Sequence, residues 1–140
     1  MLGISIRPSR LSHRLIRQTK DFVVNIPSVK ILKETDLCGV TSGNDADKFR
    51  MCSFTETAPS KISSPMISEC PVNIECTLKD IIKLGAHDLF LGEVVALHVD
   101  DGILKPDGSI DYDLALPFVY TQGEYREVGK KAGLYGFSKK

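Results

Sequence analysis

Hydrophobic and polar residues alternate in several short runs of this chain, and turn-forming residues bound each run. The runs at 3–6 (GISI) and 72–78 (VNIECTL) alternate with a period of two, the pattern of a half-buried strand. Residues 21–27 (DFVVNIP) are rich in β-branched side chains and end at a proline, which cannot donate to a strand ladder. Residues 87–100 form a longer run in which Gly92 predicts a bulge or a tight bend. We expect a strand at each of these runs.

Helices are expected where apolar residues recur at helical spacing after a polar residue that can accept hydrogen bonds from the first backbone N–H groups. This pattern predicts a helix over 13–19, a second over 28–38 that ends before Gly39, and a short helical stretch that carries Phe49. The expected N-cap residues are Ser12, Ser28 and Asp45.

The other segments are expected to be turns and short strands. Residues 55–65 hold two prolines and few apolar residues, which predicts an irregular crossing at the surface. Residues 105–111 contain an Asp-Gly turn signal, and 117–129 predicts two short strands about Gln122 and Gly123. In total we expect about five or six strands and about two or three helices. Strands of this length usually close into a small barrel, so the predicted fold is mostly β.

Composition and charge narrow the class of protein. A chain of 140 residues with 42% hydrophobic and 26% charged residues fits a single domain over 1–140. The 18 Lys and Arg residues balance the 18 Asp and Glu residues, so no overall positive field attracts nucleic acid or an anionic membrane. No stretch approaches the roughly 20 apolar residues of a spanning helix, and the first residues of this sequence do not show the charged segment, apolar run and small-residue cleavage site that a secretory leader is expected to have. A cytoplasmic protein is expected.

The cysteines and histidines lack the spacing of a metal site. The four cysteines are Cys38, Cys52, Cys70 and Cys76, which form neither a CxxC pair nor a zinc ribbon and are interpreted as reduced thiols. The three histidines are also far apart, with no HExxH motif, so no metal is predicted. The chain contains neither a GxSxG elbow nor a GxGxxG turn after a strand, which argues against a hydrolase and a Rossmann unit.

The segment RPSRLS is the first candidate binding motif. Arg7, Ser9, Arg10 and Ser12 place two guanidinium groups and two hydroxyls just ahead of a predicted helix. A helix N-terminus presents free N–H groups and a positive dipole end, and arginine can donate two hydrogen bonds to one phosphate. The motif is therefore interpreted either as a phosphate site or as a helix cap flanked by solvated arginines.

Two further segments carry candidate residues. TSGNDADKF offers Ser42 and Gly43 for close approach of a ligand, Lys48 as a point charge and Phe49 as a flat apolar wall, although an ordinary loop and helix cap has the same pattern. His87 lies at the start of the strand expected over 87–100 and has an acidic neighbour, Asp88, so it is either a surface residue or a group that positions a reductant.

Five segments together resemble the flavin reductase-like family, which is built on the FMN-binding split barrel, and most closely its flavoredoxin-type branch. They are SIRPSRLSHRLIRQTKDFVVNIP, CGVTSGNDADKF, APSKISSPMISECPVNIECTL, GAHDLFLGEVVALHVD and PFVYTQGEYREVG with GLYGFS. They follow the family's order across nearly the whole chain. The resemblance implies a homodimer with FMN at the subunit boundary.

The resemblance also assigns roles to the candidate residues. It implies that Arg7, Ser9, Arg10 and Ser12 bind the FMN phosphate, and that the loop with Ser42, Gly43, Lys48 and Phe49 lies against the flavin. It implies that His87 faces the open side of the flavin as the candidate catalytic residue. One departure is that members of this family begin with an extra pair of strands upstream of GISIRPSR. We therefore expect a shortened barrel, with Met1 an internal start, the end of a fragment or the start of a truncated gene product, unless a dimer partner or a rearranged terminus covers the gap.

The implied function is electron transfer through bound FMN. The flavin would take electrons from NAD(P)H or a redox partner and pass them to an acceptor such as free flavin or ferric iron. Two alternatives stay open, a non-enzymatic FMN electron-transfer protein and a truncated domain with impaired flavin binding.

Overall fold

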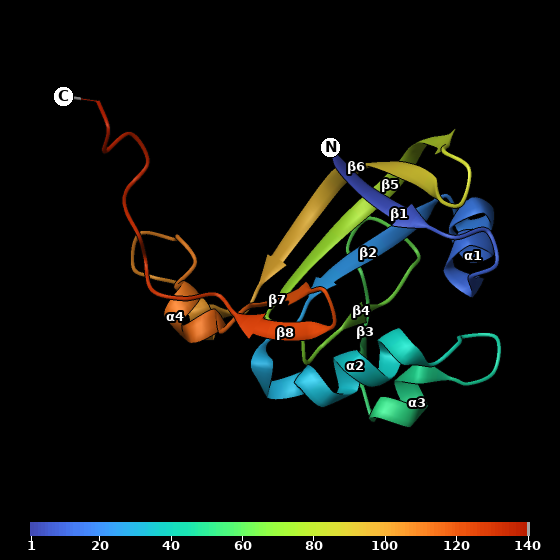
Figure 1. The fold of residues 1–140 in the computed structure, drawn as a ribbon, viewed down its shortest axis with the longest axis horizontal. Coiled ribbons are helices and arrows are strands. Elements are labelled where there is room, and N and C mark those ends of the chain that lie inside the picture. The colour runs from blue at the N-terminus through green and yellow to red at the C-terminus, as the bar shows by residue number, and fades with distance from the viewer. Residues whose placement is uncertain (140) are drawn as a thin grey trace.

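A four-stranded antiparallel sheet is the framework of the structure, a computed structural model that describes residues 1–139. The strands lie in the order β1-β6-β5-β2 (Figure 1). Their bounds are Leu2–Ile6 for β1, Asp21–Ile26 for β2, Val72–Lys83 for β5 and Asp88–Val99 for β6. All four predicted strands are confirmed. β5 extends beyond the expected 72–78 because it pairs with β6 over most of its length.

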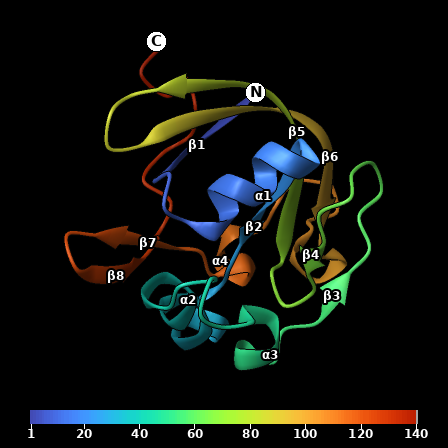
Figure 2. The ribbon, with the colours of Figure 1, turned by 90° about the vertical axis from the view of Figure 1, so that its right-hand side faces the viewer.

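The sheet curls into a half-barrel around helix α1 (Leu11–Thr19), as Figure 2 shows. The main core lies between them, and Phe90 and Cys76 have no solvent exposure there. Ile16 of α1 and Phe22 of β2 complete its buried part. The mostly β class is confirmed. Burial of these side chains against the concave face provides the largest stabilising contribution to such a fold.

Helices α2 (Leu32–Val40) and α3 (Lys48–Cys52) lie below the sheet in Figure 1 and contact each other. A 3₁₀ turn at Val29–Ile31 precedes α2, so the predicted helix over 28–38 begins later than expected and continues through Gly39. Two predicted caps are wrong, and the third, Ser28, is the N-cap residue of the 3₁₀ turn without a capping hydrogen bond. Arg10 rather than Ser12 is the N-cap of α1, and Asp47 rather than Asp45 caps α3 by accepting from the Arg50 N–H.

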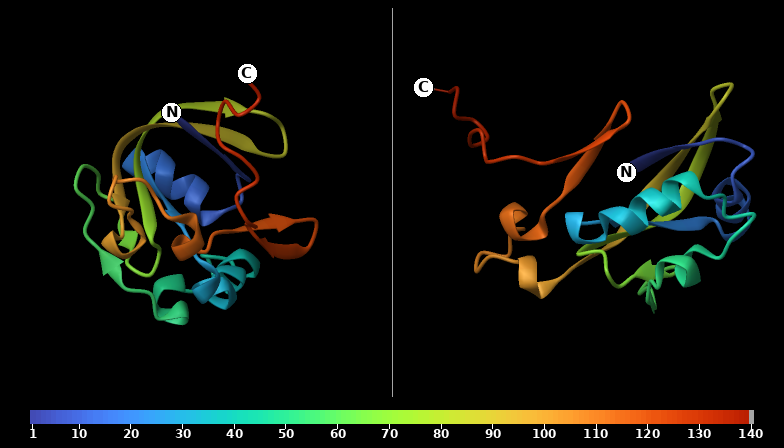
Figure 3. Two further views of the ribbon diagram at one scale, coloured as in Figure 1. Left: turned by 90° about the vertical axis from the view of Figure 1, so that its left-hand side faces the viewer. Right: turned by 60° about the horizontal axis from the view of Figure 1, so that its bottom comes forward.

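Shorter elements complete the chain. β3 (Glu56–Thr57) pairs with β4 (Met66–Ile67), and β7 (Phe118–Thr121) pairs with β8 (Glu124–Glu127). The turn between β7 and β8 has positive φ at Gln122 (44°) and Gly123 (94°), as a tight hairpin requires. A 3₁₀ turn at Asp101–Ile103 and helix α4 (Tyr112–Ala115) lie between β6 and β7. The chain after β8 runs away from the sheet in Figure 1 and in the right-hand view of Figure 3.

Gly92 serves close packing, and its pair with Leu78 lies directly beside a register shift of the β5–β6 ladder, in agreement with the bulge or tight bend predicted there. Gly92 pairs with Leu2 on one side and Leu78 on the other, while the register shifts of the β5–β6 pair fall on either side of it. A Cβ atom at Gly92 would lie 2.6 Å from Cζ of Phe22 and 3.0 Å from Cβ of Cys76. The absence of a side chain therefore allows the Phe22 ring to lie against β6.

Gly92→Ala is predicted to lower the free energy of unfolding by about 1–3 kcal/mol, because the added methyl overlaps the Phe22 ring in a packed core. Urea unfolding followed by circular dichroism measures the change. Gly129→Ala is a suitable control, since a Cβ atom there has no neighbour within 4 Å. Equal stability of the two variants would contradict the packing role.

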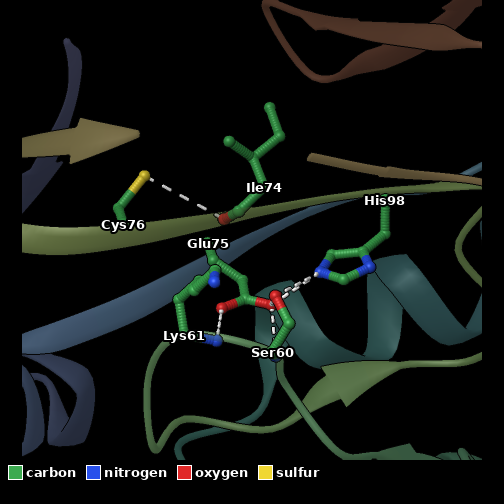
Figure 4. A network of polar contacts seen from close by, with 6 residues as sticks. All are labelled: Ser60, Lys61, Ile74, Glu75, Cys76 and His98. Atoms are coloured by element: carbon green, nitrogen blue, oxygen red, sulfur yellow. Dashed lines mark hydrogen bonds and ion pairs between the residues drawn. The ribbon is translucent and has the colours of Figure 1, made fainter. Parts of the chain in front are cut away.

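The polar face of β5 is buried, although its alternation predicted a strand with one face in solvent. Glu75 has no exposed surface and Asn73 is nearly buried, because the irregular crossing over 55–65 folds across them. Figure 4 shows the Glu75 carboxylate below the strand and Ile74 and Cys76 on the other side. β5 therefore has an apolar face against the core and a polar face against a loop.

The Glu75 carboxylate is a hydrogen-bonded anchor for this loop. It accepts from the backbone N–H of Ser60 at 2.6 Å and of Lys61 at 2.8 Å, and from the Ser60 hydroxyl at 2.9 Å. His98 Nε2 lies 2.6 Å from the same carboxylate (Figure 4). Burial by itself raises the pKa of Glu75, but these hydrogen bonds outweigh it and lower the pKa to about 2.

Candidate functional site

A cavity of about 650 Å³ lies between the start of α1 and the corner that joins α2 to α3. Figure 1 shows these three helices at one end of the molecule. The end of β1, the first turns of α1, the end of α2, the following loop and the start of α3 form its wall. The lining residues are Ile6, Arg10, Leu11, Ser12, Leu15, Cys38, Gly39, Gly43, Ala46, Asp47, Lys48 and Phe49. A volume of this size suits a cofactor or a small ligand.

Five of the nine predicted site residues line this cavity. They are Arg10, Ser12, Gly43, Lys48 and Phe49, which come from two segments far apart in the sequence. Two cationic side chains therefore share the cavity with an aromatic ring and several aliphatic side chains. The sequence did not single out the aliphatic wall, which includes Leu11 and Leu15, because apolar residues on a helix are normally part of the core.

The other predicted residues lie outside the lining. In the antiparallel β1–β6 pair, Ile6 lies opposite Asp88, so the adjacent residues Arg7 and His87 also lie close together. Arg7 Nε donates to His87 Nε2 at 3.3 Å. Ser9 lies in the turn that the Arg10 N–H closes onto the Arg7 carbonyl. Ser42 Oγ accepts from the Asn44 N–H at 3.2 Å. The roles of Arg7, Ser9, Ser42 and His87 stay predictions.

The N-terminus of α1 is electrostatically suited to an anion. No side chain caps it, and its first turn contains no acidic residue. Leu11 and Ser12 at the start of this nine-residue helix line the cavity together with Arg10, so the uncapped N-terminus and the positive end of its dipole lie at the cavity wall. The single carboxylate in the lining, Asp47, accepts from the Arg50 N–H and thereby caps α3.

Lys48 and Gly43 hold the opposite wall in position. Lys48 Nζ donates to the Cys38 carbonyl at 2.5 Å, so its charge lies at the C-terminal turn of α2, where a cation is favourable. A Cβ atom at Gly43 would lie 3.0 Å from Cδ2 of Leu11. Gly43 thus allows the close approach of Leu11, the first residue of α1, while the approach of a ligand at Gly43 stays a prediction.

A buried pair between α1 and β6 positions the helix and was missed in the sequence. His13 Nε2 lies 2.8 Å from Asp88 Oδ2, and the His13 ring packs edge-on against Phe90 with centroids 5.0 Å apart. His13 is three residues before Ile16, the other buried residue of α1, so helical spacing was the available signal. The sequence offered Asp88 only as the acidic neighbour of His87, because its burial against His13 depends on the position of α1.

The cluster of Ser60, His98 and Glu75 has the residue types of a hydrolytic triad but the wrong geometry. A triad uses one imidazole nitrogen for the serine and the other for the carboxylate. Here Nε2 of His98 faces both Ser60 Oγ (3.4 Å) and Glu75 Oε1, and the Ser60 hydroxyl donates to Glu75. The cluster anchors the loop and offers no activated nucleophile.

Two other features are absent from residues 1–139. No helix among them is both apolar and long enough to cross a membrane. No three or more His, Cys, Asp or Glu side chains are grouped there in a way that could hold a metal ion.

Comparisons with known proteins agree with this architecture. The family model described as "Flavin reductase like domain" matches residues 1–129. The chain belongs to this family.

The flavoredoxin of Desulfovibrio vulgaris (Miyazaki F) superposes with a TM-score of 0.91 at 27% identity, covering 99% of this chain and 76% of that one. The flavoredoxin of Methanosarcina acetivorans has a TM-score of 0.90 at 28% identity over 97% of this chain and 73% of that one. The predicted split-barrel fold is thereby confirmed.

Curated relatives of this flavin reductase-like chain are longer than it is. An uncharacterized protein of Archaeoglobus fulgidus is 37% identical over 111 residues, which is 79% of this chain and 62% of that protein. The chain thus spans about six tenths of that relative's length.

Proposed function

We propose that this flavin reductase-like domain is an oxidoreductase that carries electrons through FMN bound in the cavity beside α1. The observation that supports this proposal is the cavity itself, in which an uncapped helix N-terminus, two cations and an aromatic side chain meet. A phosphate fits the polar end and a planar ring system fits the apolar wall. The family match and the similarity to two flavoredoxins support the same cofactor.

In this proposal the chain positions the cofactor and controls access to it. Arg10 and Ser12 bind the phosphate at the start of α1, and Arg7 and Ser9 complete the group from the preceding turn. Lys48, Phe49, Ser42 and Gly43 hold the flavin side of the nucleotide. Bound FMN supplies the redox chemistry, taking electrons from NAD(P)H or a redox partner and passing them to an acceptor such as free flavin or ferric iron.

His87 is proposed to act at the outer edge of the site. Its Nε2 accepts from Arg7 Nε, so a ligand that draws Arg7 toward a phosphate would free the imidazole. A free imidazole can donate to or accept from a reductant. We also propose that the protein is a cytoplasmic homodimer.

Replacing Arg10 by Ala is predicted to weaken FMN binding about 10- to 100-fold and riboflavin binding by less than about 2-fold, because only FMN carries the phosphate and a charge-assisted hydrogen bond contributes about 1.5–3 kcal/mol. Quenching of flavin fluorescence measures both affinities. Arg14→Ala is the matched control, since Arg14 lies on α1 outside the cavity lining. Equal losses for FMN and riboflavin would refute the phosphate site.

A test of NADH oxidation by the FMN-loaded protein then distinguishes an oxidoreductase from a non-enzymatic electron carrier. Flavin reduction by NADH under anaerobic conditions supports the oxidoreductase. A yellow protein that NADH does not reduce is instead the non-enzymatic electron carrier.

A further inference from the structure

Two cysteines from neighbouring helices meet at the wall of the cavity. Cys38 lies near the end of α2 and Cys52 is the last residue of α3, and their Sγ atoms are 3.6 Å apart. Cys52 is buried, whereas Cys38 is partly exposed. No other pair of cysteine sulfurs is in contact within residues 1–139.

Cys38 is the sulfur of this pair that a small molecule can reach. It lines the 650 Å³ cavity on one side, and on the other side it lines a second, mainly apolar cavity of about 350 Å³, which the buried Cys70 also lines. Cys52 lines neither cavity, and its Sγ lies 3.6 Å from the Glu34 carbonyl in the interior. One thiol is therefore accessible, and the second lies directly behind it.

The geometry allows the two sulfurs to bond. A disulfide needs an S–S distance of about 2.0 Å, so the sulfurs have to approach by about 1.6 Å. Rotation about χ1 and a small shift of α3 can supply this movement, because α3 has five residues and follows a loop. The bond would close a loop of about 14 residues, which is entropically inexpensive.

We propose that Cys38 and Cys52 form a reversible dithiol–disulfide pair whose oxidant is a low-molecular-weight disulfide that enters the cavity and reacts with Cys38. The Cys38 thiolate attacks one sulfur of the oxidant, which forms a mixed disulfide and releases one small thiol. The Cys52 thiolate then attacks Cys38 Sγ, which forms the protein disulfide and releases the second small thiol. Two protein thiols are oxidised and one small disulfide is reduced.

The surroundings set the rate of this exchange. Burial, together with the neighbouring Cys52, raises the pKa of the Cys38 thiol to about 11, and the Lys48 charge partly opposes the increase. The thiol is therefore mostly protonated at neutral pH, and the exchange accelerates as the pH rises toward that pKa. This inference does not require that flavin be bound.

The test treats the reduced, folded protein with 2-hydroxyethyl disulfide in mildly alkaline buffer and counts thiols after unfolding. We expect two of the four thiols to be lost. Trypsin then releases residues 34–48 and 51–61, each with one cysteine, as a linked pair whose mass returns to that of the separate peptides after reduction. Cys70 and Cys76 share the peptide 62–79, so a linkage to either of them is recognisable.

Variants assign the order of attack. Cys52→Ser is expected to stop at a single mixed disulfide on Cys38, and Cys38→Ser is expected to prevent the loss of thiol from the folded protein. Cys70→Ser is the matched control and retains the 34–48 to 51–61 link. A link through Cys70, separate adducts on Cys38 and Cys52, or no reaction of the folded protein while the urea-unfolded protein reacts would each overturn the proposal.

Discussion

Replacing Gly39 by Leu is expected to reduce FMN binding more than about 100-fold without destabilising the fold. Gly39 is an exposed residue of α2 that lines the cavity, and a Cβ atom there has no neighbour within 4 Å. A leucine therefore projects into the space proposed for the flavin. Leucine is also a better helix former than glycine, so the free energy of unfolding should rise by about 0.5–1 kcal/mol.

Gly39→Ala is the control for this experiment. It adds one methyl in open space, improves the helix to a similar extent and leaves most of the cavity free. Fluorescence titration with FMN gives the affinity, and thermal unfolding without FMN gives the stability. If Gly39→Leu binds FMN as tightly as Gly39→Ala, the flavin does not occupy this cavity.

Glu75→Gln is expected to lower the free energy of unfolding by about 3 kcal/mol at neutral pH, the cost of disrupting a buried, hydrogen-bonded charge. The carboxylate accepts two backbone N–H groups of the loop, and an amide presents a donor to one of them. The loop at Ser60 and Lys61 would then lose part of its attachment to β5.

The same residue makes stability depend on pH. The pKa of Glu75 is about 2 in the folded protein against an ordinary value of 4.5, so the unfolded chain takes up this proton first as the pH falls. Its contribution is complete above about pH 4.5 and is lost progressively down to about pH 2. Asp21 acts in the same direction, because hydrogen bonds from Ser63 and Ser64 outweigh burial and lower its pKa.

Urea unfolding at several pH values checks both statements. The difference between wild type and Glu75→Gln should shrink as the pH falls through this window. Glu127→Gln, an exposed substitution on β8, should follow the wild-type curve. A constant difference between Glu75→Gln and wild type down to about pH 2 would show that the carboxylate charge does not hold the loop.

The strands were predictable from local pattern because each has a face that must be buried. Leu2, Ile4 and Ile6 alternate with more exposed residues along β1, and the observed burial follows the same period. The hairpin at Gln122 and Gly123 was equally predictable, since its turn needs positive φ at both positions. The N-cap residues of the helices were less predictable, because several polar residues near the start of each helix could have occupied the N-cap position.

The candidate site was predictable in part. RPSRLS and TSGNDADKF each have a local reason to bind a ligand, and their resemblance to one family connected them. Their meeting at one cavity depends on where α1 packs inside the curled sheet, which the His13 and Asp88 pair helps to set. The approach of Cys38 to Cys52 likewise depends on the packing of α2 against α3.

The amino-acid sequence by itself determined the strands, the approximate positions of the helices and the family, and it predicted residues for binding an anion, because periodicity and turn chemistry act over a few neighbouring residues. Only the tertiary structure decided that Asn73 and Glu75 are buried beneath a loop, that Gly92 accommodates Phe22, and that Arg10 and Lys48 share a cavity. The physical reason is that burial and contact depend on surfaces contributed by distant segments, and the pattern of any one segment does not contain the position of the others.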